Sequence, residues 1–234
     1  MRMFKLALVT LVLVIIVVGC REREHEQQVR EVQRDCFSAA EVDYIDFLKF
    51  NDINYSSDSI NVESIIISEL IGKPLGEVSF MMYGQACLGH QTVNGDAAFL
   101  REGTKIYAMK GYKPEFRVIA GDRIFQSNDN PNAKTVSDVL DIAGKVEKVT
   151  EESTEDGSRI RELDPLQAKA FIVQILSLAY VKQEELAKLP SGGTMFFRIH
   201  LTDGTSFRIA FSKESKALSI GAIGNEEIQS LLVD

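Results

Sequence analysis

The histidines are the side chains whose ordinary pKa lies closest to neutral pH, so they are the first candidates for acid–base chemistry. The sequence holds three of them, His25, His90 and His200. A nucleophilic enzyme pairs a serine or cysteine with a histidine base, and a third group orients that base. His25 lies in a stretch of charged residues, and His200 is expected on the polar side of a strand. Neither position suits a base, and we expect a protein that is not an enzyme.

The segment Cys87-Leu88-Gly89-His90 has the spacing of half a metal site. Structural zinc needs four ligands, and apart from Cys36 the sequence offers no second cysteine or histidine pair for it. We therefore expect no metal and no cofactor. In an oxidising compartment Cys36 and Cys87 could form a disulfide, and the alternative is that both are buried free thiols.

Carboxylates are plentiful, for example at Glu151-Glu152 and Glu155-Asp156. These pairs flank an expected hairpin turn, where acidic side chains usually face solvent. A hydrolase that uses two carboxylates stays open as an alternative, because the fold sets the distance between such groups.

Aromatic and basic residues alternate between residues 107 and 117, where Tyr107, Tyr112, Phe116 and Arg117 occur together with two lysines. This mixture is typical of surfaces that contact a protein or a glycan. The alternative interpretation places Tyr107 and Phe116 in the core and leaves the basic side chains solvated. This segment is our candidate binding site.

The N-terminus carries Arg2 and Lys5, followed by an apolar run from Leu6 to Gly19 that ends at Cys20. A membrane-spanning helix needs roughly 20 apolar residues, and this run is shorter. A basic start, a short apolar run and a small residue before the cut are typical of a cleaved signal peptide. We assign residues 1–19 to that signal.

Two parts of the sequence resemble bacterial lipoproteins. Val17-Val18-Gly19-Cys20 resembles the lipobox, which implies cleavage before Cys20 and attachment of a diacylglyceryl group to its sulfur. The glycine- and tyrosine-containing pattern in residues 103–117 is similar to that of uncharacterised lipoproteins of Bacillus-like bacteria. The resemblance implies a protein held by Cys20 on the outer, extracytoplasmic face of the cell membrane. An uncleaved anchor and cleavage without lipid are the alternatives.

The remaining chain is divided by composition. Residues 20–40 form the anchor and a charged tether, residues 41–126 a strand-rich subdomain, and residues 136–234 an α+β subdomain. In the last part Asp164-Pro165 indicates a helix start, and apolar residues at three- and four-residue steps predict an amphipathic helix of about 24 residues, to Lys188. Strands that alternate around Asp203-Gly204 predict a hairpin. The expected fold class is α+β, mostly antiparallel strands in two small subdomains, with the long helix on the C-terminal sheet.

The net charge of the chain is −8. Loss of residues 1–19 removes two basic side chains and no acidic ones, which brings the charge to about −10 and disfavours nucleic acid as a partner. We therefore expect a non-enzymatic binding or regulatory ectodomain that contacts a protein or an envelope component. A receptor for a small solute ranks last, because receptors of that kind usually alternate β and α elements.

Overall fold

The computed structural model describes residues 45–57, 60–62, 67–87 and 89–233. The predicted signal peptide, the predicted tether, Cys20, His25 and Cys36 lie outside the described residues. Both sheets belong to one compact unit, Asp43–Tyr83 with Thr92–Asp234, and Gly84–Gln91 falls in the other unit. Among the described residues, none of the helices combines the length and the apolar character that a membrane crossing requires.

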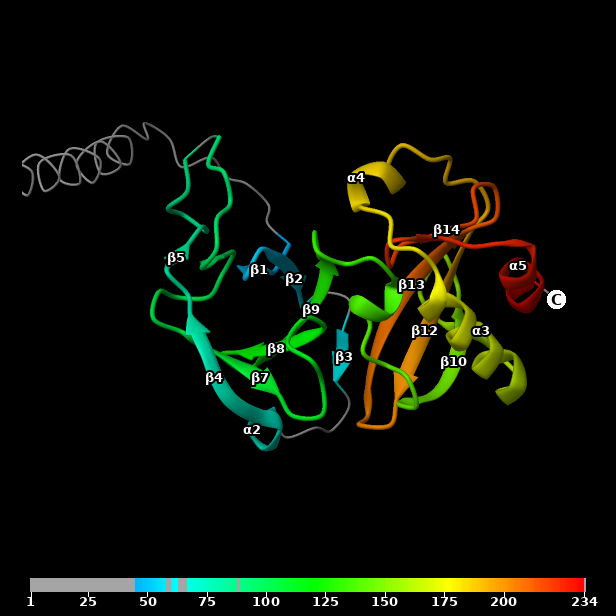
Figure 1. The fold of residues 1–234 in the computed structure, drawn as a ribbon, viewed down its shortest axis with the longest axis horizontal. Helices are drawn as coiled ribbons and strands as arrows, with labels where there is room; N and C mark the ends of the chain where they lie inside the picture. Colours follow the sequence, from blue (N-terminus) through cyan, green and yellow to red (C-terminus); the bar gives the residue numbers. More distant parts are fainter. Residues whose placement is uncertain (1–44, 58–59, 63–66, 88, 234) are drawn as a thin grey trace, which may run out of the picture. The chain divides into compact units, whose positions relative to one another are not determined.

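The described strands form two sheets and are mostly antiparallel, which confirms the predicted α+β class with its excess of strands (Figure 1). The first sheet has the order β4-β7-β8-β9-β2-β1-β6-β5. Its strands are β1 (Phe47–Phe50), β2 (Ile53–Ser56), β4 (Ile71–Glu77), β5 (Phe80–Met81), β6 (Asp96–Ala97), β7 (Lys105–Met109), β8 (Arg117–Ala120) and β9 (Arg123–Asp129), and a short helix, α2 (Ile67–Leu70), precedes β4.

The first sheet curls so that its edge strand β4 approaches β1. A Cβ atom placed on Gly76 of β4 would lie only 2.7 Å from the ring of Phe50 in β1, so the close approach requires glycine there. The register between β4 and β7 shifts on both sides of Pro74, where the sequence predicts a bend. The curled sheet surrounds a core that includes Leu48, Ile106 and Phe125.

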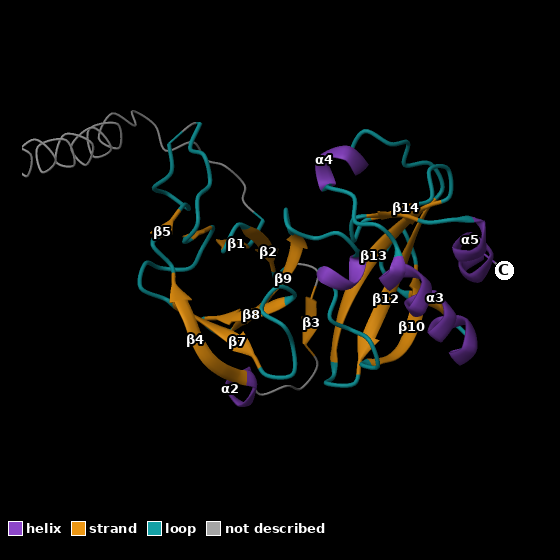
Figure 2. Cartoon of the chain, in the orientation of Figure 1, coloured by secondary structure: helices purple, strands orange, loops and turns teal. Residues whose placement is uncertain are grey.

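The second sheet has the order β11-β10-β12-β13-β14-β15, and β3 pairs with β13. Its elements and the helices beside it are β3 (Ile60–Val62), η1 (Val136–Asp138), β10 (Val146–Glu152), β11 (Arg159–Glu162), α3 (Pro165–Ser177), α4 (Gln183–Leu186), β12 (Thr194–Leu201), β13 (Thr205–Ser212), β14 (Ala217–Leu218), β15 (Ala222–Ile223) and α5 (Glu226–Val233). Figure 2 shows α3 and α5 beside this sheet, and the two helices contact each other. The hairpin predicted around Asp203-Gly204 is confirmed as β12–β13.

Helix α3 begins where the sequence predicts, because the side chain of Asp164 accepts a hydrogen bond from the backbone N–H of Leu166 and Pro165 is the first helical residue. Its buried face includes Phe171 and Ile175, which pack into the core of the second sheet. The predicted length is wrong, since the helix ends at Ser177 rather than near Lys188.

Long-range contacts explain this early end. Leu178 is extended, Ala179 bridges to Thr135, and the hydroxyl of Tyr180 donates to Asp129 at 2.9 Å. The ring of Tyr180 also lies against Gly221, whose φ of +91° and lack of a Cβ leave room for it. These tertiary contacts outweigh the helical propensity of the segment.

Candidate functional site

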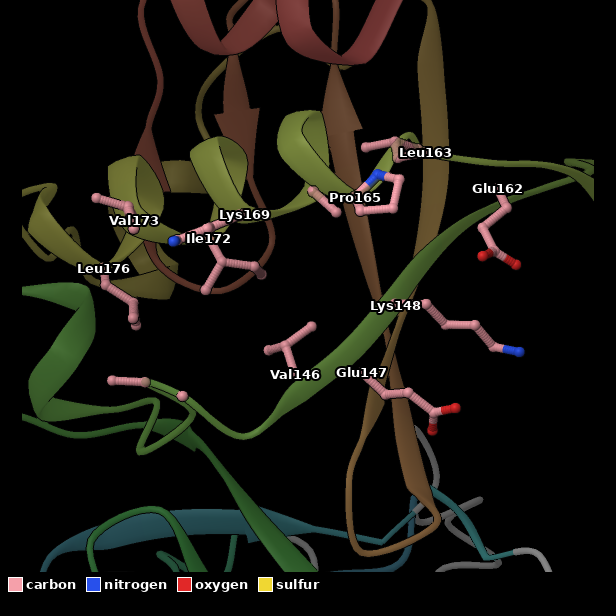
Figure 3. Close-up of a pocket in the computed structure, with 13 residues that line it drawn as sticks. Val146, Glu147, Lys148, Glu162, Leu163, Pro165, Lys169, Ile172, Val173 and Leu176 are labelled. Atoms are coloured by element: carbon pink, nitrogen blue, oxygen red, sulfur yellow. The ribbon is translucent and has the colours of Figure 1, made fainter.

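A groove of about 360 Å³ lies between α3 and the first half of β10 (Figure 3). Its apolar lining comes from Val146, Leu163, Ala168, Ile172, Val173 and Leu176. In Figure 3, Ile172, Val173 and Leu176 stand on the helix opposite Val146 on the strand. A pocket of this size with an apolar lining is typical of a ligand site.

The groove exists because β11 is shorter than β10. The register pairs β11 only with Thr150, Glu151 and Glu152, and the chain then turns through Leu163 into α3. The half of β10 that includes Val146 therefore has no flanking strand among the described residues on that side. The gap between this half of β10 and the helix is the groove.

Charged side chains from both walls surround the apolar lining. Glu162 forms an ion pair with Arg159, with a nitrogen–oxygen distance of 3.5 Å. Glu147, Lys148 and Lys169 form no such pair with any described residue. Lys169 is the only charged residue of α3, and Val173 beside it is 62% exposed, so the rim combines an available cation with exposed apolar surface.

The candidate binding segment predicted between residues 107 and 117 is placed largely in the interior. Phe116 is buried in the core of the second sheet, and the Arg117 side chain is 0% exposed. Tyr107 and Tyr112 are half-buried, and both pack against the small apolar cluster beside α2. These side chains therefore do not form an exposed surface, and Tyr112, Phe116 and Arg117 connect the two sheets instead.

Arg117 of β8 lies in a cage of aromatic rings and hydrogen-bond acceptors. Its guanidinium carbon lies 4.8 Å from the ring centre of Phe116, and its nitrogens donate to Gln126 at 2.8 and 3.0 Å and to Thr205 at 2.6 Å. Burial lowers the pKa of Arg117 to about 10, so the guanidinium keeps its charge at neutral pH. The nearest carboxylate is that of Asp203, 3.9 Å away.

The hydroxyl of Tyr112 donates to Asp203 at 2.7 Å, which completes the cluster around Arg117. Burial and this hydrogen bond raise the pKa of Tyr112. Burial alone would raise the pKa of Asp203, but hydrogen bonds from Thr205 and Tyr112 and the charge of Arg117 hold it below its usual value. The cluster links the end of β7 and the start of β8 to the β12–β13 turn, so its role is to join the sheets.

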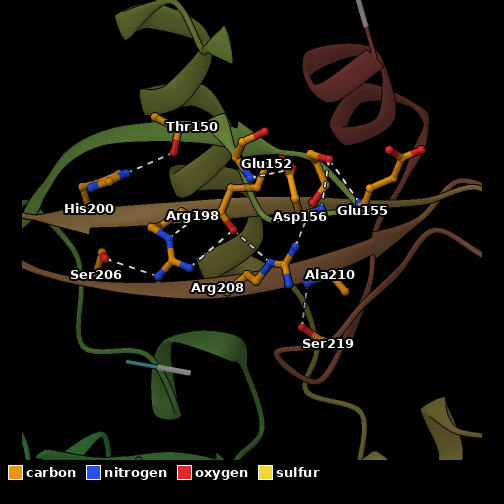
Figure 4. A network of polar contacts seen from close by, with 12 residues as sticks. Thr150, Glu152, Glu155, Asp156, Arg198, His200, Ser206, Arg208, Ala210 and Ser219 are labelled. Carbon is orange, nitrogen blue, oxygen red and sulfur yellow. Dashed lines mark hydrogen bonds and ion pairs between the residues drawn. The ribbon is translucent and has the colours of Figure 1, made fainter. Parts of the chain in front are cut away.

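A second polar network lies on the face of the second sheet that points away from α3 (Figure 4). The buried carboxylate of Glu152 accepts from Arg198 and forms an ion pair with Arg208 at 2.9 Å. The guanidinium of Arg208 also stacks 3.7 Å from the ring centre of Phe196. Both oxygens of Glu152 are thus engaged by guanidinium groups from β12 and β13.

This network leads to a stability prediction for Glu152→Gln. An amide keeps the shape but leaves two arginines without their counter-charge, so we expect the free energy of unfolding to fall by about 2–4 kcal/mol. Urea unfolding measures the change. Glu155→Gln, at an exposed position in the β10–β11 turn, is the control and should change it by less than about 0.5 kcal/mol. Equal midpoints for Glu152→Gln and the native protein would contradict the prediction.

Three of the histidines and cysteines of the sequence, Cys87, His90 and His200, lie in the part of the chain that the structure describes. Nε2 of His200 lies 3.0 Å from the hydroxyl of Thr150 on the polar face of the second sheet. Cys87 is disulfide-bonded, which leaves it no thiolate for a metal. Cys36 lies outside the described residues, so its pairing with Cys87 stays a prediction. Within the part of the chain that the structure describes, no three His, Cys, Asp or Glu side chains gather as a metal site would require.

The sequence pattern did not predict the groove. Val173 and Leu176 lie beside the apolar stripe that predicts the buried face of the helix. They make the apolar face of the helix wider than its core contact requires, and this is the feature of the sequence that could have indicated the groove. Comparisons of the chain with family models, with curated proteins and with solved structures find no match. Its function is therefore inferred from its own residues.

Proposed function

We propose that this chain is a lipoprotein, anchored through Cys20 on the extracytoplasmic face of the cell membrane, whose folded part is a non-enzymatic binding module. The N-terminal sequence supports the anchor through its short apolar run and the lipobox-like Val17-Val18-Gly19-Cys20. Two or more acyl chains hold a protein stably on a bilayer, whereas a single chain binds only marginally. A diacylglyceryl cysteine therefore suffices as the anchor.

The groove between α3 and β10 is the observation that carries the binding role. It offers about 360 Å³ lined by apolar side chains, and its rim carries charges that form no ion pair with any residue that the structure describes. Leu166 and Val173, both on α3, are 77% and 62% exposed, so the helix presents apolar surface beside the groove as well as inside it. Exposed apolar surface with a polar rim is typical of a binding site.

Photo-crosslinking in intact cells tests this role. A benzophenone side chain at Val173 or at Lys169, both exposed at the groove, should give a covalent adduct with the bound molecule. The same group at Asp122, which is exposed in the turn between β8 and β9, serves as the control and should give none. Mass spectrometry of the adduct identifies its chemical class. No adduct at either groove position, or equal adducts at Asp122, would contradict the proposal.

A further inference from the structure

The free edge of β10 beside the groove is suited to pair with another strand. On one side β12 pairs with β10 along its whole length, from Val146 to Glu152. On the other side the last contact is the hydrogen bond from the backbone N–H of Leu163 to the carbonyl of Val149, at 2.9 Å. Val146–Lys148 thus forms an edge with no strand beside it among the described residues. Such an edge presents backbone donors and acceptors that an added strand can use.

The groove gives that edge a side-chain pocket. Side chains alternate between the two faces of a strand. A strand added beside Val146–Lys148 would therefore place every second side chain on the face where α3 presents Ile172 and Leu176. Main-chain hydrogen bonds then supply affinity, and the pocket selects the alternate apolar residues.

A bulge limits how long the added strand can be. The register between β10 and β12 shifts between Val146 and Lys148, which makes Glu147 the bulged residue. Bulges twist an edge and interrupt its regular pattern. The free part of β10 therefore fits a short segment, and it does not offer the long flat edge on which open-ended aggregation depends.

The charges at the rim indicate which segment would fit. Glu162 is already paired with Arg159, and the opposite charges of the neighbouring Glu147 and Lys148 on β10 offset each other. Lys169 on the helix has no carboxylate partner among the described residues. Helix α3 carries no acidic residue that could balance Lys169. Lys169 is thus an uncompensated positive charge in a chain with a net charge of −8, and an acidic side chain or a C-terminal carboxylate complements it.

We infer that the groove binds a short, extended, acidic peptide segment of a partner protein, which adds as a strand to β10 at Val146–Lys148. Its alternate apolar side chains enter the groove, and its carboxylate faces Lys169. This inference rests on the proposed binding function and names the class of ligand.

Binding of synthetic peptides to the full-length protein in detergent micelles tests the inference. The probes are fluorescein-labelled peptides of ten residues in which valine or isoleucine alternates with threonine. In each peptide of the set one threonine is replaced by aspartate, at a different position in each peptide. We expect members of this set to bind with Kd below about 1 mM. N-methylation removes the hydrogen-bond donor of a backbone amide, and only every second amide of an added strand faces β10. Methylation of the set that faces β10 should weaken binding about tenfold or more, and methylation of the other set should weaken it much less.

Variants of the protein separate the groove from other surfaces. Lys169→Glu should weaken binding of the aspartate peptides about tenfold and restore it for peptides that carry lysine instead. Lys213→Glu, at an exposed position away from the groove, should leave both affinities unchanged. Hydrogen exchange at Val146–Lys148 should slow when the peptide binds, whereas exchange at Lys105–Met109 of the first sheet should not.

Three results would overturn the inference: no peptide of the set binds, both phases of N-methylation have equal effects, or exchange at Val146–Lys148 is unchanged. The crosslinking experiment distinguishes this failure from failure of the proposed function. An adduct at Val173 that proves to be a lipid or another small molecule would keep the binding role and exclude the peptide. An adduct with an extended protein segment would support both.

Discussion

Cys20→Ser is expected to abolish lipid attachment completely. In the anchor that we propose, the acyl-bearing group is joined through the sulfur of Cys20, and a serine at this position offers no thiol to the modifying enzyme. Metabolic labelling with palmitate followed by immunoprecipitation measures the attachment. The native protein should carry the label, and the variant should carry none.

Loss of the lipid should also change where the protein is found. Each buried CH₂ contributes about 0.8 kcal/mol to membrane binding, so a protein without the acyl chains loses most of its affinity for the membrane. The exception is a protein from which the apolar run before Cys20 has not been cleaved. Cys36→Ser is the control, because it removes a thiol without changing the residues around the cleavage point. Palmitate label on the Cys20→Ser variant would show that the anchor assignment is wrong.

Local signals predicted several elements well because they act over a few residues. Asp164 and Pro165 define the start of α3 through one capping hydrogen bond and one fixed φ angle. Asp203-Gly204 turns the chain between β12 and β13, where Gly204 has a φ of +81°. Information of this kind is present in the sequence around each turn or cap.

The end of α3 and the interior position of Arg117 depend on distant residues, so the local pattern did not reveal them. Tyr180 leaves the helical path to reach Asp129, which is 51 positions earlier. Arg117 donates to Thr205, which is 88 positions later. Aromatic and basic residues close together in sequence look alike whether they form a surface patch or a buried cage, and only the packing of the second sheet decides between the two.

The groove could not be predicted for a related reason. It requires that β11 stop at Glu162 while β10 begins at Val146, and a strand boundary is set by pairing as much as by composition. The apolar residues of α3 predict that the helix packs on a sheet. They do not show that one part of the sheet beside it lacks a neighbouring strand.

Arg117→Ala is expected to lower the free energy of unfolding by about 3–5 kcal/mol. The substitution leaves the carbonyl of Gln126 and the hydroxyl of Thr205 without their donor, and it opens a cavity between the rings of Phe116 and Phe207. Buried acceptors without partners and an unfilled cavity both destabilise the folded state. Urea unfolding, followed by tyrosine fluorescence, measures the change.

Two further substitutions at Arg117 separate charge from shape. Arg117→Met fills much of the volume but donates no hydrogen bonds, so it should still cost about 2–3 kcal/mol. Arg117→Lys keeps the charge but loses the planar fork that reaches Gln126 and Thr205 together. It should lower the free energy of unfolding, but by less than Arg117→Met does. Arg101→Ala, at an exposed position in the first sheet's loop, is the control and should change stability by less than about 0.5 kcal/mol.

These variants also decide between the two roles that Arg117 can have. A surface residue that contacts a partner would, when replaced by alanine, weaken binding and leave the urea midpoint unchanged. Replacement of a buried residue that joins two sheets would lower the urea midpoint, and it would reduce binding only by reducing the fraction of the protein that is folded. Because Arg117 is 0% exposed and bonds to Gln126 in one sheet and Thr205 in the other, we expect the second result. A native midpoint for Arg117→Ala would show that this contact does not hold the sheets together.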